Sequence, residues 1–312
     1  MSLQYDLTKA CTADMQNNTT LRVMRTACRR FSKWCKESNI TKMKAIEKDG
    51  AVETIQRYAD YLTDRGYAPS TIHTYLAAPC KALRVPMDKI DKPLRTSDTI
   101  TRSRNAKRNL QGRKELDMPR FQRIIEFQKV VGIRRAELKH LTGADLETDE
   151  SGYLCVVVRR GKGGKTQYQR ILPGNEEIVK KTFEGAAPCD RVFSAVELNN
   201  KLDFHGMRAE NAKKAYEYYS GFSSGDRVQL LYELECRWLR FHPKCTRHSR
   251  EFYRWRSQLF KSTGLYYVRG NNLDRAVEKG RPIVYDRLAV MATSVFHLSH
   301  WRLNVTIQHY LL

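Results

Sequence analysis

Six side chains with complementary chemistry occur along this sequence, the last of them close to its final residue. They are Arg134, Lys162, His205, Arg208, His300 and Tyr310. A tyrosine phenol has an ordinary pKa of about 10 and becomes a good nucleophile once its proton is removed. Guanidiniums can grip two phosphate oxygens at once, and histidine and lysine can carry protons. Such a set can break and remake a phosphodiester without a metal ion.

Four short motifs carry these residues. They are G-I-R-R-A-E-L (132–138), R-G-K-G-G-K (160–165), F-H-G-M-R (204–208) and L-S-H-W-R-L-N-V-T-I-Q-H-Y (298–310). Each motif alone is weak, because histidine–arginine pairs and lysines in glycine turns are common. Four motifs in this order, ending in a tyrosine, are a much more specific signal.

Composition points to a polyanionic partner. The 312 residues include 56 Lys and Arg against 34 Asp and Glu, which gives a formal net charge of +22. Clustered positive charge of this size favours DNA or RNA, whose counterions are released on binding. Hydrophobic residues make up 41% of the chain, enough for a core, and the length suits two domains. The eight cysteines contain no CxxC pair, so reduced thiols are expected.

The first 91 residues predict a small helical bundle. Residues 1–20 are polar and indicate a loose arm. Apolar residues at helical spacing predict helices over 21–36 and 52–62. Ser70 is the expected cap of a third helix, which Pro79 should kink or restart.

A basic stretch over 92–114 follows, and it contains few residues that could join a core. We expect it to link two domains and to lie along the DNA backbone rather than serve as a neutral tether. Its candidate DNA-binding residues are Arg102, Arg104, Lys107, Arg108, Arg113 and Lys114.

Residues 115–312 predict helices mixed with a small sheet. A helix over 118–141 should break near Gly132, and strands over 153–159 and 166–172 should be joined by the glycine turn. Another helix is expected over 207–219. Asp286 should cap a further helix, and a short last helix starting at Asn304 should carry Tyr310.

In wording and order, the four motifs resemble those of the tyrosine recombinases, or phage-type integrases. The resemblance covers most of the chain. It implies a mostly α fold with a small β-sheet (α+β): a two-domain DNA clamp with a helical, SAM-like core-binding domain and a tyrosine recombinase catalytic domain. We place these domains at 1–91 and 115–312.

The resemblance also implies catalytic roles for the six residues. Tyr310 would attack the phosphodiester and form a 3′-phosphotyrosine, while Arg134 and Arg208 stabilise charge on the phosphate oxygens. Lys162, preferred over Lys165, would protonate the leaving 5′-oxygen. His205 would accept the tyrosine proton or assist on its return, and His300 would hydrogen-bond a phosphate oxygen.

The sequence departs from the family pattern at Ser299, at Ala209, where the family often has histidine, and in length. Ser299 stands where the family usually has glycine, which matters if that position needs a positive φ. An extra segment at about 221–283 separates Arg208 from His300. Its aromatic and basic residues fit either a packed helical lobe or an extra contact with DNA or a partner. Cys236, His242, Cys245 and His248 lie close together there, but their spacing matches no zinc pattern, so neither metal nor cofactor is expected.

The resulting hypothesis is site-specific DNA recombination that integrates or excises a mobile element. Two alternatives stay open: a type IB topoisomerase-like DNA relaxer, and a DNA-binding protein that has lost catalysis. The implied partners are double-stranded DNA attachment sites, three further copies in a synaptic homotetramer (a monomer when free) and accessory DNA-bending proteins. No signal peptide or apolar span is seen, so a cytoplasmic, nucleoid-associated location is expected.

Overall fold

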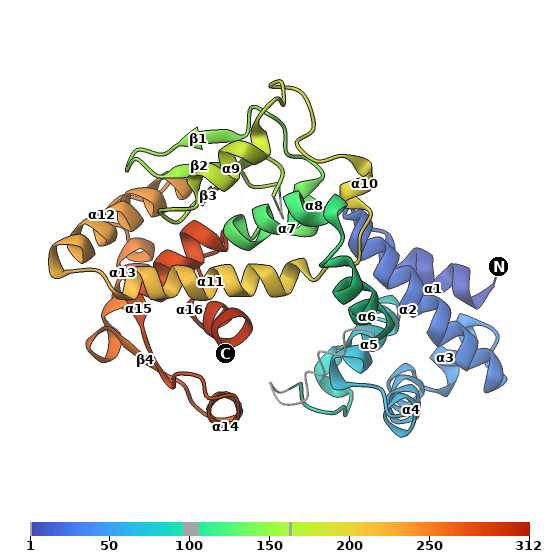
Figure 1. Cartoon of the computed structure of the whole chain (residues 1–312). Coiled ribbons are helices and arrows are strands. Elements are labelled where there is room, and N and C mark those ends of the chain that lie inside the picture. Colours follow the sequence, from blue (N-terminus) through green and yellow to red (C-terminus); the bar gives the residue numbers. More distant parts are fainter. Residues whose placement is uncertain (1, 96–105, 162–163) are drawn as a thin grey trace. The chain divides into compact units, whose positions relative to one another are not determined.

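A computed structural model describes residues 2–95, 106–161 and 164–312 of the chain. The chain divides into two compact units, Met1–Arg102 and Ser103–Leu312. The elements are mostly helices, joined by two small antiparallel sheets, so the fold class is α+β (Figure 1). The finer division at residues 91 and 114 stays a prediction.

The first unit is entirely helical over its described residues. Its elements are α1 (Leu3–Thr12), α2 (Asn18–Glu37), α3 (Met43–Asp49), α4 (Ala51–Asp64), α5 (Pro69–Ala82) and η1 (Met87–Lys89). Buried aromatic rings join α2 to α4, with Phe31 and Tyr58 edge-to-face at 5.0 Å. Stacked and edge-to-face aromatic pairs of this kind fix how helices cross.

Two expectations for this unit are wrong. Residues 3–12 form α1 rather than a loose arm, because Leu3, Leu7 and Cys11 recur at helical spacing and are all buried. Ser70 does not cap α5. Ala68 is the N-cap and Pro69 takes the first turn, where its missing N–H costs nothing, and α5 continues through Pro79.

The second unit holds the remaining helices and both sheets. Its first part contains α6 (Ala106–Glu115), α7 (Pro119–Val131), α8 (Arg135–Leu138), β1 (Leu146–Thr148), β2 (Leu154–Val158), β3 (Gln167–Arg170), α9 (Glu176–Phe183) and α10 (Ala195–Leu198). Its second part contains α11 (Phe204–Ser220), α12 (Ser224–Phe241), α13 (Arg250–Phe260), η2 (Lys261–Gly264), β4 (Leu265–Tyr267), α14 (Asn271–Glu278), β5 (Val284–Asp286), α15 (Arg287–Ala292), η3 (Thr293–His297), α16 (Leu303–Thr306) and η4 (Ile307–Leu311).

Several of these elements confirm the sequence patterns. Gly132 adopts the left-handed conformation and ends α7, as the break near it predicted. Strand β2 pairs antiparallel with β3, and β1 adds a third strand that the sequence did not predict. The Asp286 side chain accepts a hydrogen bond from the backbone N–H of Ala289, so it caps α15 as expected.

Helix α11 runs through the middle of this unit, with the three-stranded sheet on one side (Figure 1). One core cluster packs α7 against the sheet and α9. A second joins α11 to the segment 221–283 and to the C-terminal helices. In particular, Trp238 and Trp255 of that segment share a core with Met291 and Leu311.

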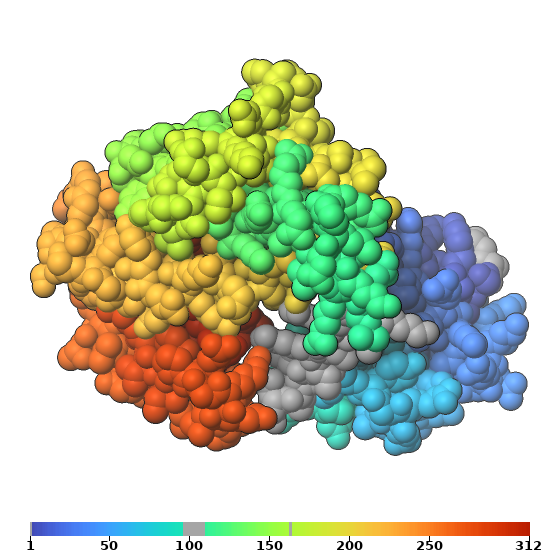
Figure 2. Space-filling model, viewed as in Figure 1, coloured from blue at the N-terminus to red at the C-terminus, as the bar shows by residue number. Residues whose placement is uncertain are grey.

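The extra segment therefore has no core of its own. Its buried side chains complete the core beneath the final helices, and the two regions form one continuous surface (Figure 2). Removing 221–283 would expose that shared core, so point substitutions are the right way to test its role. In the described part of the chain, no helix is long and apolar enough to cross a membrane.

Candidate active site

Tyr310 lies on the last helical turn, η4, and three of the predicted residues surround its ring. The ring centroids of His205 and His300 lie 5.5 Å and 6.2 Å from that of Tyr310. The guanidinium carbon of Arg208 lies 5.9 Å from the same centroid. Buried Ile307 and Leu311 anchor the turn on either side of the tyrosine. Residues about a hundred positions apart in sequence thus meet at one phenol.

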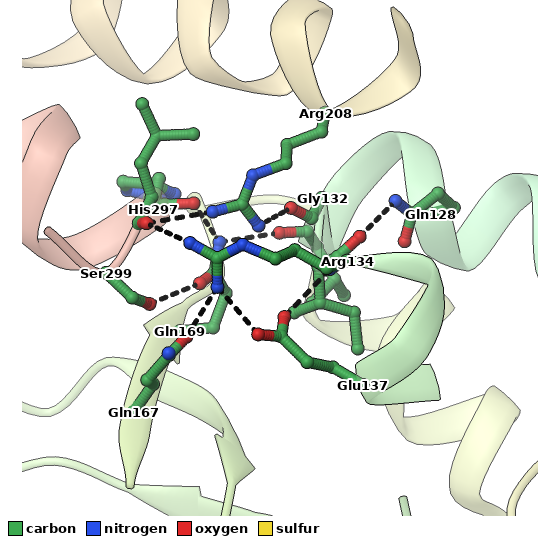
Figure 3. Close-up of polar contacts among 12 residues, drawn as sticks. Gln128, Gly132, Arg134, Glu137, Gln167, Gln169, Arg208, His297 and Ser299 are labelled. Atoms are coloured by element: carbon green, nitrogen blue, oxygen red, sulfur yellow. Dashed lines mark hydrogen bonds and ion pairs between the residues drawn. The ribbon is translucent and has the colours of Figure 1, made fainter. Parts of the chain in front are cut away.

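The two arginines of the site, Arg134 and Arg208, lie side by side (Figure 3). Arg208, on α11, is almost fully buried and donates hydrogen bonds to the backbone carbonyls of Gly132 and Leu298. Arg134, the N-cap residue of α8, also donates to Leu298, at 3.4 Å. The tight turn at Gly132 and the shared Leu298 carbonyl therefore hold both guanidiniums in place.

Arg134 is partly exposed and also forms an ion pair. Its Nη1 lies 2.6 Å from Oε1 of Glu137, and Glu137 also accepts from the backbone N–H of Arg134 at 2.8 Å. The other carboxylate oxygen thus closes a capping box at the start of α8. The arrangement fixes Arg134 before any ligand arrives, and preorganised donors are the ones that stabilise developing charge best.

The positive charge of Arg208 is destabilised by its surroundings. Burial lowers the pKa of the guanidinium, and the charge of Arg134 lowers it further, whereas Tyr310 raises it. Two adjacent cations, one of them buried, are stabilised when an anion enters between them. A phosphate has the charge and the oxygen geometry to do this.

His300 is held in one tautomer by Ser294. The Ser294 hydroxyl donates to the backbone carbonyl of His300, and its Oγ also lies 2.8 Å from Nδ1 of the ring. The hydroxyl has one hydrogen and the carbonyl has none, so both contacts are hydrogen bonds only in the tautomer whose Nδ1 carries a proton and donates to Ser294. The other ring nitrogen, Nε2, is then an acceptor.

Nε2 of His300 is buried and has no hydrogen-bond partner among the described residues. Burial lowers the pKa of His300 from 6.5 to about 3, and the charges of Arg208 and Arg134 contribute. The ring is therefore neutral at physiological pH. It offers an unused proton acceptor beside Tyr310.

Tyr310, His300 and Arg134 line a cavity of about 550 Å³. Its other described lining residues are Lys165, Thr166, Gln167, Tyr168, Arg237, Phe241, Val295, Ser299, Trp301, Arg302 and Val305. No carboxylate is part of this lining as far as the chain is described. A cavity lined by four basic side chains and no acidic one favours an anion.

Not every predicted residue can be placed. Lys162 lies outside the described residues, whereas Lys165 lines the cavity. Arg102 and Arg104 also lie outside them. The other four candidates, Lys107, Arg108, Arg113 and Lys114, belong to α6, where Arg113 and Lys114 are exposed.

The four close cysteines and histidines of the extra segment do not form a metal site in the structure. Over the described ranges, no group of three or more His, Cys, Asp or Glu side chains could hold a metal ion. His242 instead stacks on Trp238 at 4.0 Å, and its Nδ1 lies 2.8 Å from the Trp238 carbonyl.

Sequence reasoning missed three residues of the site. Ser294 orients His300, Arg237 of α12 lines the cavity, and Gln169 of β3 donates to the carbonyls of Val131 and His297. No short motif marks them. Only the alternation of β3 carried a signal, since it turns Gln169 inward, and a buried glutamine needs partners.

Solved structures that resemble the chain include XerA recombinase and the Tn1549 transposon integrase. XerA recombinase shares 16% identity over 90% of this chain and 98% of that chain, with a TM-score of 0.26. The Tn1549 transposon integrase, solved with transposon right-end DNA, shares 12% identity over 99% of this chain and 95% of that one, with a TM-score of 0.40. No protein-family model and no curated protein matches the chain. These scores are low, so we infer the function from the site alone.

Ser299 is the subject of a first prediction. It adopts a positive φ of 54°, a conformation that favours glycine. Its hydroxyl donates to Oε1 of Gln169 at 3.3 Å. Ser299→Gly and Ser299→Ala both lose that bond, but only glycine relieves the backbone. We expect the glycine variant to be more stable than the alanine variant by about 1 kcal/mol, measured by denaturant unfolding. Equal stability, or a more stable alanine variant, would contradict a strained backbone here.

The two buried histidines predict how stability depends on pH. Burial lowers the pKa of His297 to about 3, with Arg170 adding to the effect, and His300 has a similar value. In the unfolded chain both titrate near 6.5, so between pH 6.5 and pH 3 the unfolded state binds more protons. Stability must therefore fall as the pH drops through that window.

From pH 7 to pH 5, each histidine should cost about 2 kcal/mol of unfolding free energy. Denaturant unfolding at the two pH values measures the loss. The His300→Gln variant should lose about 2 kcal/mol less unfolding free energy than the wild type over this pH change, because only His297 then contributes. If the variant and the wild type lose the same stability, then His300 is protonated in the native state.

Proposed function

We propose that this protein cuts and rejoins DNA through a transient 3′-phosphotyrosine at Tyr310, as a site-specific recombinase acting on a mobile element. One observation carries the proposal. The ring of Tyr310 lies against Arg208, His205 and His300, in a cavity that Arg134 also lines. A nucleophile, two fixed guanidiniums and a neutral proton acceptor are together what phosphodiester transfer needs.

In the proposed reaction, the Tyr310 oxygen attacks the phosphorus and the bond to the 5′-oxygen breaks. Arg134 and Arg208 hold the non-bridging oxygens as their charge increases. Their hydrogen bonds to the Leu298 carbonyl aim both guanidiniums before the substrate binds. The phosphotyrosine conserves the energy of the broken bond, so the returning 5′-hydroxyl can reseal the strand without a nucleotide cofactor.

In our proposal, proton transfer differs in part from the sequence-based expectation. That expectation had His205 accept the tyrosine proton or assist on its return, and had His300 hydrogen-bond a phosphate oxygen. When Nδ1 of His300 donates to Ser294, Nε2 is an acceptor and does not donate to a phosphate oxygen. We assign the tyrosine proton to His300, whose pKa rises when the entering phosphate offsets the charges of Arg208 and Arg134. The ring centroid of His205 lies 5.5 Å from that of Tyr310, so His205 can serve during resealing.

The leaving 5′-oxygen needs a proton, and two lysines are candidates. Lys165 lines the cavity, and Lys162, which lies outside the described residues, precedes it by three positions in the sequence. Replacing the lysine that donates this proton with alanine should lower the cleavage rate roughly 100-fold. A DNA with sulfur in place of the bridging 5′-oxygen has a leaving group that needs no proton. Cleavage of that DNA should be restored in the variant lacking the donor and unchanged in the other. If neither lysine variant is rescued, another group supplies the proton.

A covalent trap tests the proposal. The protein is incubated with a chelator and with nicked duplexes of random sequence. After cleavage, the short fragment between the cleavage point and the nick, which carries the new 5′-hydroxyl, diffuses away, so the strand cannot be resealed. The expected result is an SDS-resistant protein–DNA adduct, with the DNA mapped by mass spectrometry to Tyr310. The trapped sequences would also identify the attachment site.

Other outcomes favour the alternatives. Tight DNA binding without any adduct would favour a binding protein without catalysis. An adduct that forms on any sequence, with relaxation of supercoiled plasmid by a single copy, would favour a topoisomerase-like relaxer. Recombination between two trapped sites would support the full proposal.

A further inference from the structure

Arg237 is a basic residue of the site that lies outside all four motifs. It projects from the middle of α12, in the extra segment, and lines the same cavity as Arg134, His300 and Tyr310. Its guanidinium carbon lies 4.9 Å from the ring centroid of Phe296 and 5.6 Å from that of Tyr168. Its Nη2 donates to the Tyr168 carbonyl at 2.9 Å. These contacts fix the guanidinium in the wall of the cavity.

Arg237 differs from its basic neighbours because it has no acidic partner. Arg170 pairs with Asp149 and Glu233, and Arg240 pairs with Glu150. No carboxylate oxygen of a described residue lies within 4.0 Å of Arg237. A largely desolvated guanidinium without a counter-charge is costly unless an anion completes it.

The electrical surroundings of Arg237 point in the same direction. Burial lowers its pKa from 12.5 to about 10, and the charge of Arg170 adds to this effect. Arg237 also lines a second cavity, where Glu147, Asp149, Glu150 and Glu233 lie beside Arg170 and Arg240. Each of those four carboxylates already forms an ion pair with another arginine, whereas the described lining of the basic cavity of the site contains no carboxylate. An anion that compensates it is favoured on the basic side, where Arg134, Lys165 and Arg302 also attract it.

We propose that Arg237 binds a DNA phosphate in the catalytic cavity, next to the phosphate that Tyr310 attacks. The inference rests on the proposed function, because it takes the ligand to be DNA. It gives the extra segment a role that its packing alone does not explain. Helix α12 would both support the C-terminal helices through its core face and supply a further phosphate contact.

A neutral-phosphate scan tests this inference. A series of nicked duplexes of the trapped sequence each carries one methylphosphonate, which removes the charge of one phosphate, at positions around the cleavage point. Adduct formation is compared for the wild type, Arg237→Gln and Arg240→Gln. Arg237→Gln removes the charge and keeps an N–H donor on the side chain. Arg240→Gln removes an equal charge from the same helix, one turn away and outside this cavity.

On unmodified DNA we expect Arg237→Gln to slow adduct formation about 10- to 100-fold, and Arg240→Gln to change it less than about 3-fold. At one methylphosphonate position the wild type should become as slow as Arg237→Gln. The difference in rate between the two proteins should therefore disappear at that position and persist at all others. In Arg237→Gln the slope of log binding constant against log salt concentration should also fall by about one, because one fewer counterion is released on binding. A merely structural role would change neither the position dependence nor the salt slope.

The inference is overturned if the Arg237→Gln defect is the same at every position, or if Arg240→Gln shows an equal defect. It is also overturned if Arg237→Gln forms adduct at the wild-type rate. A failure of the wild type to form any adduct would instead reject the proposed function. The two failures are therefore distinguishable in one experiment.

Discussion

Tyr310→Phe should reduce covalent adduct formation at least about 10⁴-fold, because it removes the attacking oxygen and little else. Phenylalanine keeps the ring that contacts His205, His300 and the Arg208 guanidinium. Ile307 and Leu311 still anchor the turn. Both DNA affinity and the free energy of unfolding should therefore stay close to their wild-type values. The rate is measured on the nicked duplex after mixing a large excess of protein with labelled DNA.

Tyr168→Phe is the matched control. Tyr168 also lines the cavity, so it is the substitute nucleophile to exclude. Its variant should still form the adduct. If Tyr310→Phe retained the adduct and Tyr168→Phe lost it, the nucleophile would be misassigned. Loss in both, with intact folding and binding, would mean that the cavity needs both hydroxyls.

The parts of the fold that depend on neighbouring residues could be predicted from sequence. Gly132 ends α7 because a left-handed residue is needed there, and Asp286 caps α15 through its own side chain. The glycine turn after β2 predicted the pairing with β3. In each case a few consecutive residues determine the conformation.

Features that depend on distant residues could not be predicted in the same way. Helix α1 looks polar in sequence. It forms because its three buried side chains, Leu3, Leu7 and Cys11, join the core that α2 and α5 also build. Arg237 looks like one cation among many in 221–283. Its importance comes from the core that α12 shares with the C-terminal helices, which brings its guanidinium to the wall of the cavity.

In the candidate site, too, some features follow from the local sequence and others depend on distant residues. The residue types and their order predicted side chains that lie together in the structure, but not their hydrogen bonds. The tautomer of His300 depends on Ser294, whose hydroxyl is shared between a backbone carbonyl and a ring nitrogen. No spacing rule predicts such sharing. In our proposal it makes the histidine a proton acceptor rather than a donor.

Arg208→Lys should be the next most damaging change, lowering the rate of adduct formation about 10³-fold. Lysine keeps a positive charge but has no planar fork. It cannot donate to Gly132 and Leu298 and also present two N–H groups to a phosphate. One buried carbonyl would lose its donor, so the variant should also be less stable by about 1–3 kcal/mol.

Arg135→Lys separates the two effects. Arg135 also donates to backbone carbonyls, those of Asn200 and Leu202, but it is not part of the cavity lining. Its variant should lose comparable stability and keep the wild-type rate per folded molecule. A methylphosphonate at the attacked phosphate should further shrink the Arg208→Lys defect, because less charge then develops on the non-bridging oxygen. An undiminished defect on that DNA would mean that Arg208 supports the fold of the site rather than the charge of the reacting phosphate.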